Sequence, residues 1–284
     1  MIVGMRFDVV TIFPGFFEGF LAHGVVRRAL KDGLVTVEAH DLRAYTHDRH
    51  RTVDDRPFGG GEGMVLKPEP LAEALAALGV APKAREQGSG IRDQKARVIL
   101  LSAQGRVFTQ AVARQLAGLE RVVLVCGRYE GVDERINELY CDEELSIGDY
   151  VLSGGEAAAM VVMDAAIRLI PGVLGNEASG EFESFGAADA EIDTDVEGVP
   201  RSQHGAGGLL DYPQYTRPAE FEGLRVPEVL LNGDHAEIRR WRREQQLRKT
   251  LRNRPELLVD ANLSAEDQTI VEALRKTADL RDGA

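Results

Sequence analysis

Short apolar runs alternate with helical segments through the first two thirds of the chain. Runs rich in strand-forming residues occur at 7–13, 34–39, 98–101 and 121–126, and helices are predicted over 16–30, 68–78 and 109–119. Strands that alternate with helices in this way predict an α/β domain with a largely parallel sheet and flanking helices.

The stretch from 146 to 167 joins a short apolar run, a glycine pair and a helix. Residues 150–152 have strand character, Gly154 and Gly155 form a turn without side chains, and apolar residues recur at helical spacing from 157 to 167. A turn of this kind offers backbone N–H groups to a ligand such as a phosphate. Glycine is also the residue that unusual φ and ψ values require. At this point both interpretations stay open.

The ends of three predicted strands share one feature, a polar turn that contains glycine. These turns follow Leu101, Cys126 and Leu152. Ligands of open α/β sheets bind at the carboxyl ends of the strands. Three such turns on one sheet therefore predict a binding pocket at that edge.

Residues 45–64 form a polar segment without apolar periodicity. The segment is dense in His, Asp and Arg and ends in four glycines within five residues. A solvated surface loop is the simplest interpretation, yet loops often carry function, and Arg49, Arg51 and Arg56 are suited to binding phosphate. The histidines lack a metal-ligand spacing, and no Lys-Ser or Lys-Thr follows the glycines as a P-loop requires. We therefore predict no metal site.

The composition changes from residue 186 onwards. Asp and Glu alternate with small residues over 186–207, which predicts a flexible acidic linker or a long disordered loop. A helix is predicted from an N-cap at Asp234 to residue 254, and eight of its residues are Lys or Arg. Such a helix is often only a solvated face, but in an acidic protein it also indicates a polyanion site. Leu263, Ile270 and Leu274 are the predicted core of a small helical domain. The predicted domains are 1–175, a linker at 176–211, and 212–284.

The overall composition limits the classes of protein that remain. It is that of a soluble globular protein, with 44% hydrophobic and 28% charged residues. The net charge of −12 argues against polyanion binding by the whole surface, but a local basic cluster is compatible with it. No signal peptide or membrane-spanning run is indicated, and Cys126 and Cys141 suggest neither a disulfide framework nor a metal site. The expected location is the cytoplasm.

Five longer motifs run through the chain. They read THDRHRTVDDRP from Thr46, VCGRYEGVDER from Val125, SIGDYVLSGGE from Ser146, IPGVLG from Ile170 and HAEIRRWR from His235. Together they resemble the bacterial tRNA (guanine-37-N1)-methyltransferases, S-adenosylmethionine-dependent enzymes of the SPOUT superfamily. The resemblance spans nearly the whole chain apart from 84–96 and 186–207.

This resemblance implies a deep trefoil knot in the N-terminal domain, an exception to the rule that chains do not thread loops. It also implies S-adenosylmethionine as cofactor and a homodimer whose active sites draw residues from both subunits. The loops of the knot would form the cofactor pocket, and they coincide with the strand ends identified above. The implied cofactor residues are Leu101, Ser102, Gly127, Tyr129, Glu130, Ser146, Ile147, Gly148, Asp149, Tyr150, Val151, Leu152, Gly154 and Gly155.

Methyl transfer to guanine N1 needs a base and a cation. N1 carries a proton at neutral pH that a carboxylate should accept, and a cation should stabilise the negative charge that develops on O6. Arg168 matches the family's catalytic arginine, although an arginine is also favoured at a helix C-terminus. The family's aspartate before Ser-Phe is replaced here by Glu183, which keeps the carboxylate and adds one methylene. We expect Glu183 to be the base, with the nearby Asp189 as the alternative.

The resemblance further implies tRNA with guanine at position 37, next to the anticodon, as the substrate. Bases in such a single-stranded loop can be recognised on their edges. Two alternatives stay open: a SPOUT enzyme that methylates ribose 2′-hydroxyls, and an RNA-binding homologue with weakened turnover. The expected tRNA contacts, those of the basic helix mainly to phosphates, are Arg49, Asp54, Arg56, Arg239, Arg240 and Arg243.

Overall fold

The computed structural model of the chain describes residues 4–83, 96–175, 183–186, 207–259 and 261–282. The loop predicted at 82–95 and the acidic segment predicted at 186–207 therefore lie largely outside the described residues, and so does Asp189. The chain divides into two compact units, Met1–Gly175 and Asn176–Ala284.

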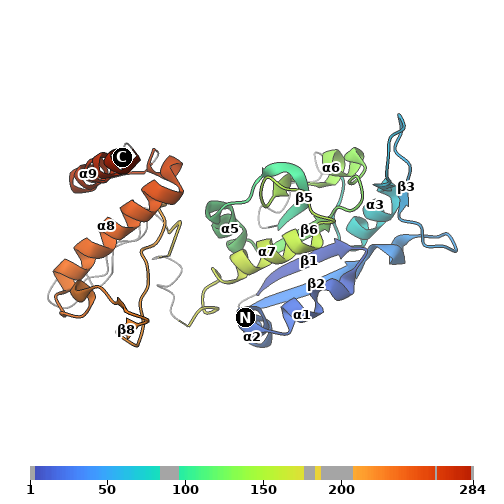
Figure 1. The fold of residues 1–284 in the computed structure, drawn as a ribbon. Helices are drawn as coiled ribbons and strands as arrows, with labels where there is room; N and C mark the ends of the chain where they lie inside the picture. The colour runs from blue at the N-terminus through green and yellow to red at the C-terminus, as the bar shows by residue number, and fades with distance from the viewer. Residues whose placement is uncertain (1–3, 84–95, 176–182, 187–206, 260, 283–284) are drawn as a thin grey trace. The chain divides into compact units, whose positions relative to one another are not determined.

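A five-stranded sheet forms the centre of the N-terminal unit (Figure 1). Its strands lie in the order β2-β1-β6-β5-β7, and neighbouring strands pair in parallel. Val9 of β1, for example, lies opposite Ala39 of β2 and Leu124 of β6. The predicted α/β class with a parallel sheet is confirmed. The strands are β1 (Met5–Thr11), β2 (Val35–Asp41), β5 (Ala96–Val107), β6 (Arg121–Cys126) and β7 (Glu143–Ser146).

Helices cover both faces of the sheet, which is why its central strands are apolar without interruption. On β6, Leu124 is buried against one layer of helices, while Val123 and Val125 are buried against the other. Side chains that alternate between two covered faces leave no solvent face on this strand. The first layer contains α2 (Gly24–Lys31), α5 (Gln110–Ala117) and α7 (Glu156–Ile167), and the second contains α3 (Pro68–Ala77) and α6 (Glu134–Tyr140).

Three predicted elements are wrong in their extent. The turn predicted after Leu101 is a bulge within β5, which continues to Val107. Residues 150–152 form no strand, because the strand before α7 is β7, which ends at Ser146. β7 lies at the edge of the sheet, where the half-buried Glu143 and Glu144 are tolerated, so its apolar signal is weak. The helix predicted over 16–30 is interrupted, since Gly24 has a φ of +63°. The shorter elements are η1 (Pro14–Phe17), α1 (Glu18–Leu21), η2 (Leu42–Tyr45), β3 (Asp54–Asp55) and β4 (Val65–Leu66).

A buried carboxylate joins three strands of the sheet. Asp8 of β1 is fully buried, and its oxygens lie 2.7 Å from Nη2 of Arg6, 2.7 Å from Nη2 of Arg121 and 2.8 Å from Nε2 of His40. Asp8, Glu38 and His40 also have the spacing of possible metal ligands. Because two guanidinium groups already hold the Asp8 carboxylate, we interpret this cluster of described residues as an ion-pair network.

We expect this network to make the protein less stable in acid. Burial raises the pKa of Asp8, but hydrogen bonds from Arg6, His40 and Arg121 outweigh it and lower the pKa from 3.8 to about 2. A depressed carboxyl pKa stabilises the fold above the unfolded pKa, here by about 2 kcal/mol, and this contribution is lost as the pH falls from about 4 to about 2. Urea unfolding at a series of acidic pH values should show the loss. Asp8→Asn should flatten that pH dependence, and an equal slope in both proteins would contradict the prediction.

The C-terminal unit is organised around two helices, α8 (His235–Asn253) and α9 (Ala265–Asp282). Asp234 caps α8 as predicted, since its carboxylate accepts hydrogen bonds from two backbone N–H groups of the first turn. Leu247 and Val271 are buried between the helices, and the predicted core residues Leu263, Ile270 and Leu274 pack against them. The remaining elements are β8 (Glu220–Phe221), β9 (Leu224–Arg225), η4 (Glu228–Leu230) and η5 (Pro255–Leu258). Within the described ranges, every helix is too short or too polar to cross a membrane.

Candidate active site

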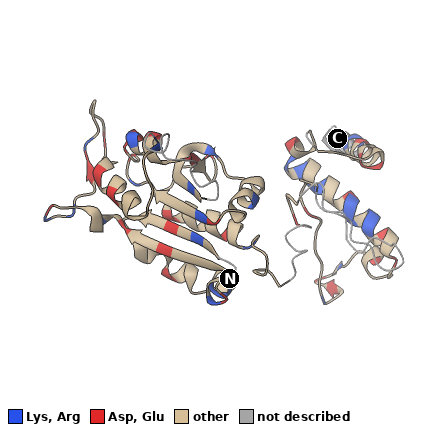
Figure 2. Cartoon of the chain, turned by 180° about the vertical axis from the view of Figure 1, so that it is seen from behind, with Lys and Arg blue, Asp and Glu red and all other residues tan. Residues whose placement is uncertain are grey.

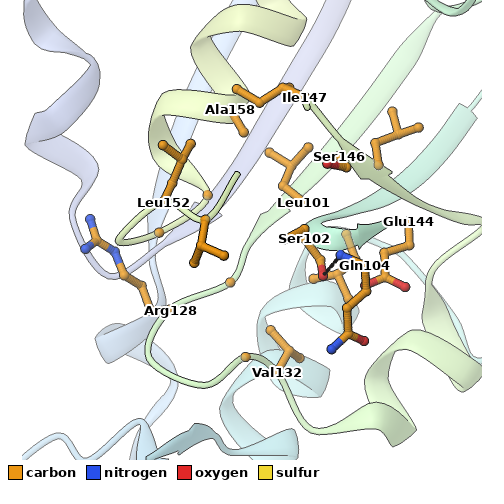
Figure 3. A pocket seen from close by; sticks show the side chains of 18 of the residues that line it. Leu101, Ser102, Gln104, Arg128, Val132, Glu144, Ser146, Ile147, Leu152 and Ala158 are labelled. Atoms are coloured by element: carbon orange, nitrogen blue, oxygen red, sulfur yellow. Dashed lines mark hydrogen bonds between the residues drawn. The ribbon is translucent and has the colours of Figure 1, made fainter. Parts of the chain in front are cut away.

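A cavity of about 360 Å³ opens at the carboxyl edge of the parallel sheet (Figure 3). Its sides are the bulge of β5 after Leu101, the loop after β6 and the loop between β7 and α7. The three segments meet because β6, β5 and β7 are neighbours in the sheet and run in the same direction. A ligand site at this edge is what the parallel topology predicts.

The cavity brings together residues that lie far apart in the sequence. All of the cofactor residues implied by the resemblance line it except Asp149, which is exposed on the loop before α7. The lining residues of that set are Leu101, Ser102, Gly127, Tyr129, Glu130, Ser146, Ile147, Gly148, Tyr150, Val151, Leu152, Gly154 and Gly155.

Gly155 is required for close approach, and neither glycine of the pair is required for unusual backbone angles. The φ of Gly155 is an ordinary −75°, and Gly154 has no positive φ. A Cβ at Gly155 would lie 2.7 Å from Cα of Cys126, and one at Gly154 would lie 2.1 Å from Nε of Arg128. The N–H of Gly155 donates to the carbonyl of Gly127 at 2.9 Å. Because this N–H joins two loops, it is not available to a phosphate.

Glu156, the first residue of α7, is buried and fixes the loop before the helix. Its carboxylate accepts hydrogen bonds from Oγ1 of Thr11 at 2.7 Å and from Nε of Arg128 at 3.0 Å. The Arg128 guanidinium also lies 4.6 Å from the centre of the Phe13 ring and donates to the carbonyl of Ser153 at 2.9 Å. A carboxylate is favoured at a helix N-terminus. The ends of β1 and β6 are thus tied to the start of α7.

The charges around the cavity favour a cationic ligand. Glu130, Glu134 and Glu144 line it, whereas the lining arginine, Arg128, is already paired with Glu156. An excess of carboxylates attracts positive charge and repels phosphate. The paired N–H of Gly155 and the excess of carboxylates both argue against a phosphate ligand.

The chain matches the family model for the tRNA (guanine-1)-methyltransferase TrmD over residues 5–260. It belongs to the TrmD family. Its relatives include the tRNA (guanine-N(1)-)-methyltransferase of Koribacter versatilis, which is 55% identical over 97% of this chain and 100% of the relative. The tRNA (guanine-N(1)-)-methyltransferase of Geobacter sulfurreducens is 49% identical over 96% of this chain and 98% of the relative. The family resemblance stated from the sequence motifs is therefore confirmed.

Arg168, the expected catalytic arginine of this TrmD-family chain, does not line the cavity. It is half-buried at the C-cap of α7, whereas the cavity lies at the N-terminal end of the same helix. At about 1.5 Å per residue, Arg168 lies about 20 Å from Gly155 along the helix. One copy of the N-terminal unit therefore does not place Arg168 at its own cavity.

Glu183, the expected base, belongs to the C-terminal unit. The backbone N–H of Phe185 donates to the carbonyl of Leu209 at 2.8 Å, and Oγ of Ser184 accepts from the N–H of Asp211 at 2.9 Å. Leu209 is fully buried in the core around α8 and α9. The segment that carries Glu183 is thus held by the C-terminal unit of the TrmD-family fold.

The expected tRNA contacts of the N-terminal unit lie around β3. Asp54 is half-buried on this strand, and Arg49 and Arg56 are exposed on either side of it. The loop is ordered by the carboxylate of Asp48, which accepts hydrogen bonds from the N–H and the hydroxyl of Thr52 at 2.9 and 2.8 Å. Arg49 and Arg56 are therefore exposed to solvent in a segment that side-chain hydrogen bonds help to order.

The helix α8 is strongly basic, with seven Lys or Arg and two Glu between His235 and Asn253 (Figure 2). Arg240 is exposed and Arg239 is half-buried. Arg243 instead donates to both carboxylate oxygens of Asp267 on α9, at 2.9 and 2.8 Å. Burial raises the pKa of Asp267, but the hydrogen bonds and charge of Arg243 outweigh it and lower the pKa overall. Arg243 therefore joins the two helices, which reduces its availability to RNA.

Sequence reasoning missed several residues of the cavity. Glu134 and Glu144 come from α6 and β7, which the apolar pattern did not predict. Gln104 and Arg128 lie in segments that were predicted to be turns, next to residues assigned to the cofactor. Assigning every residue of those segments to the cavity would have found both. Figure 3 shows Gln104, Arg128 and Glu144 around the same cavity.

Proposed function

We propose that the chain transfers the methyl group of S-adenosylmethionine to N1 of guanine 37 in tRNA. The observation that carries this proposal is the cavity at the strand ends, lined by the residues that the family's motifs assign to the cofactor. Membership of the TrmD family supports guanine N1 over a ribose hydroxyl as the methyl acceptor. A tRNA substrate also supports the expected location in the cytoplasm.

The residues of the cavity fit S-adenosylmethionine. Leu101, Ile147 and Leu152 provide apolar surface for an adenine ring, and the backbone of residues 146–152 offers hydrogen-bonding groups for its edge. The carboxylates of Glu130 and Glu144 favour a ligand with sulfonium and ammonium charges. Bound there, the cofactor supplies an electrophilic methyl group.

Two side chains would carry the proton and charge chemistry. Glu183 would accept the N1 proton of guanine as the new N–C bond forms, and Arg168 would stabilise the negative charge that develops on O6. The base is a glutamate in place of the family's aspartate, so its longer side chain has to be accommodated by the C-terminal unit that holds it.

We infer that the active site is shared between two copies of the chain. The distance of about 20 Å between Arg168 and Gly155 along α7 supports this, because a second copy is needed to bring an arginine to each cavity. Tyr129, Tyr150 and Val151 around the cavity are exposed, Val151 to 87%, and exposed apolar groups that cluster in this way mark interaction sites. The trefoil knot is inferred from the family resemblance. An isolated antiparallel β-bridge between Arg128 and Gly154 supports close packing of the loop after β6 against the loop before α7.

Contacts to tRNA are proposed on both units. Arg49, Asp54 and Arg56 would contact the anticodon loop, and Arg239 and Arg240 would contact phosphates. The paired Arg243 contributes to this proposal mainly by holding α8 in place.

The proposal is tested by incubating the protein with S-adenosylmethionine and tRNA that carries either guanine or adenine at position 37. Primer extension should stop at position 37 in the guanine substrate only, because a methyl group on N1 blocks base pairing. A product on a ribose hydroxyl would favour the other SPOUT reaction. Binding of the guanine substrate without any methylated product would favour an RNA-binding homologue.

A further inference from the structure

The C-terminal unit contains a second cavity, of about 310 Å³, that the proposed reaction does not use. It lies between residues 212–217 and the first half of α8. The ring of Tyr215 is 6.2 Å from the ring of Trp241, and the Arg242 guanidinium lies 4.8 Å from the ring of Tyr212. The cavity therefore has aromatic walls and a guanidinium group stacked on one of them.

Polar side chains line this cavity beside its aromatic rings. Nε of Arg242 is buried and has no hydrogen-bond partner among the residues that the structure describes. Nε is closed off from solvent, so the hydrogen bonds to a ligand have to come from other groups of the lining. Gln214 and Thr216 add further polar side chains to the lining.

We propose that this cavity binds one unstacked base of the tRNA, an inference that rests on the proposed tRNA substrate. Unstacked bases bind by stacking on aromatic rings and guanidinium planes and by hydrogen bonds to their edges, and the cavity offers both. Its volume lies at the small end of ligand sites, which suits one base and excludes a duplex. Arg217 also lines the cavity, so a phosphate beside the bound base would meet positive charge.

The sequence provides a specific reporter for this site, because Trp241 is its single tryptophan. We expect substrate tRNA to change the fluorescence of Trp241 in a saturable way, and a single-stranded oligoribonucleotide to do the same at higher concentration. Tyr215→Ala should weaken both by about 10- to 100-fold, as loss of a stacking ring does, whereas Tyr215→Phe should keep the affinity. Phe221→Ala removes an exposed aromatic of the same unit outside the cavity and should have no effect.

Salt dependence separates a base site from a phosphate site. Tyr215→Ala should lower the binding constant for tRNA but leave the slope of its logarithm against the logarithm of salt concentration unchanged. Arg240→Ala should reduce the magnitude of that slope by about one. Methylation by the wild-type protein with no Trp241 signal at saturating tRNA would overturn the base site and leave the proposed function intact. An equal signal from duplex RNA would overturn the base site as well. A saturable signal without methylation would support the base site and overturn the proposed function alone.

Discussion

Glu183→Gln is expected to lower kcat for guanine N1 methylation by about 10²–10⁴-fold, the usual contribution of a positioned general base. The amide keeps the size of the side chain but does not accept the N1 proton. The segment is held to the C-terminal unit through Ser184 and Phe185, so the variant should keep its fold and its affinity for tRNA. Single-turnover methylation at saturating tRNA measures the effect.

Two variants sharpen this test. Glu183→Asp restores the residue that the family normally carries and should retain much more activity than Glu183→Gln. Glu228→Gln neutralises another carboxylate of the same unit, on η4, and should behave as wild type. Near-normal turnover by Glu183→Gln would remove Glu183 from the mechanism, and Asp189→Asn would then be the next variant to measure.

Gly155→Ala is expected to weaken S-adenosylmethionine binding by at least about tenfold. The new Cβ would lie 2.7 Å from Cα of Cys126 and 3.1 Å from the backbone nitrogen of Gly127. Relief of this overlap requires the loop after β6 to move away from the loop before α7, and these loops form two sides of the cavity. Isothermal titration calorimetry measures the affinity, and the melting temperature shows whether stability falls as well.

Gly19→Ala is the matched control for this prediction. Gly19 lies in α1, and a Cβ added there would meet no packing neighbour within 4 Å, so the same methyl group should be tolerated. Cofactor binding by Gly155→Ala at the wild-type affinity would show that the two loops do not have to touch for the pocket to form.

The basic helix illustrates how far the sequence leads and where it stops. Its position, its N-cap at Asp234 and its excess of arginines follow from the residue pattern, and the structure has all three. The pattern does not distinguish Arg240, which is exposed, from Arg243, which is paired with Asp267, 24 residues further along the chain. That distinction depends on how α9 packs, and packing is decided by contacts distant in sequence.

The strand β7 illustrates the opposite case, in which the local pattern pointed to the wrong residues. Residues 150–152 are more apolar than 143–146, yet 143–146 form the strand. An edge strand is defined by its backbone pairing with β5, and it does not require apolar side chains at every position. Residues 150–152 are apolar for another reason, since they line the cavity and are exposed there. A ligand wall and a buried strand have similar composition.

The residue pattern predicts the α/β class, the parallel sheet, the basic C-terminal helix and the three segments that form the pocket. These features are local, because periodicity and glycine turns act over a few residues. The tertiary structure shows why Gly155 is a glycine, which carboxylates surround the cavity, and that Glu183 is held by the C-terminal unit. Each of these depends on atoms that come close only when distant segments pack, so no local pattern encodes it.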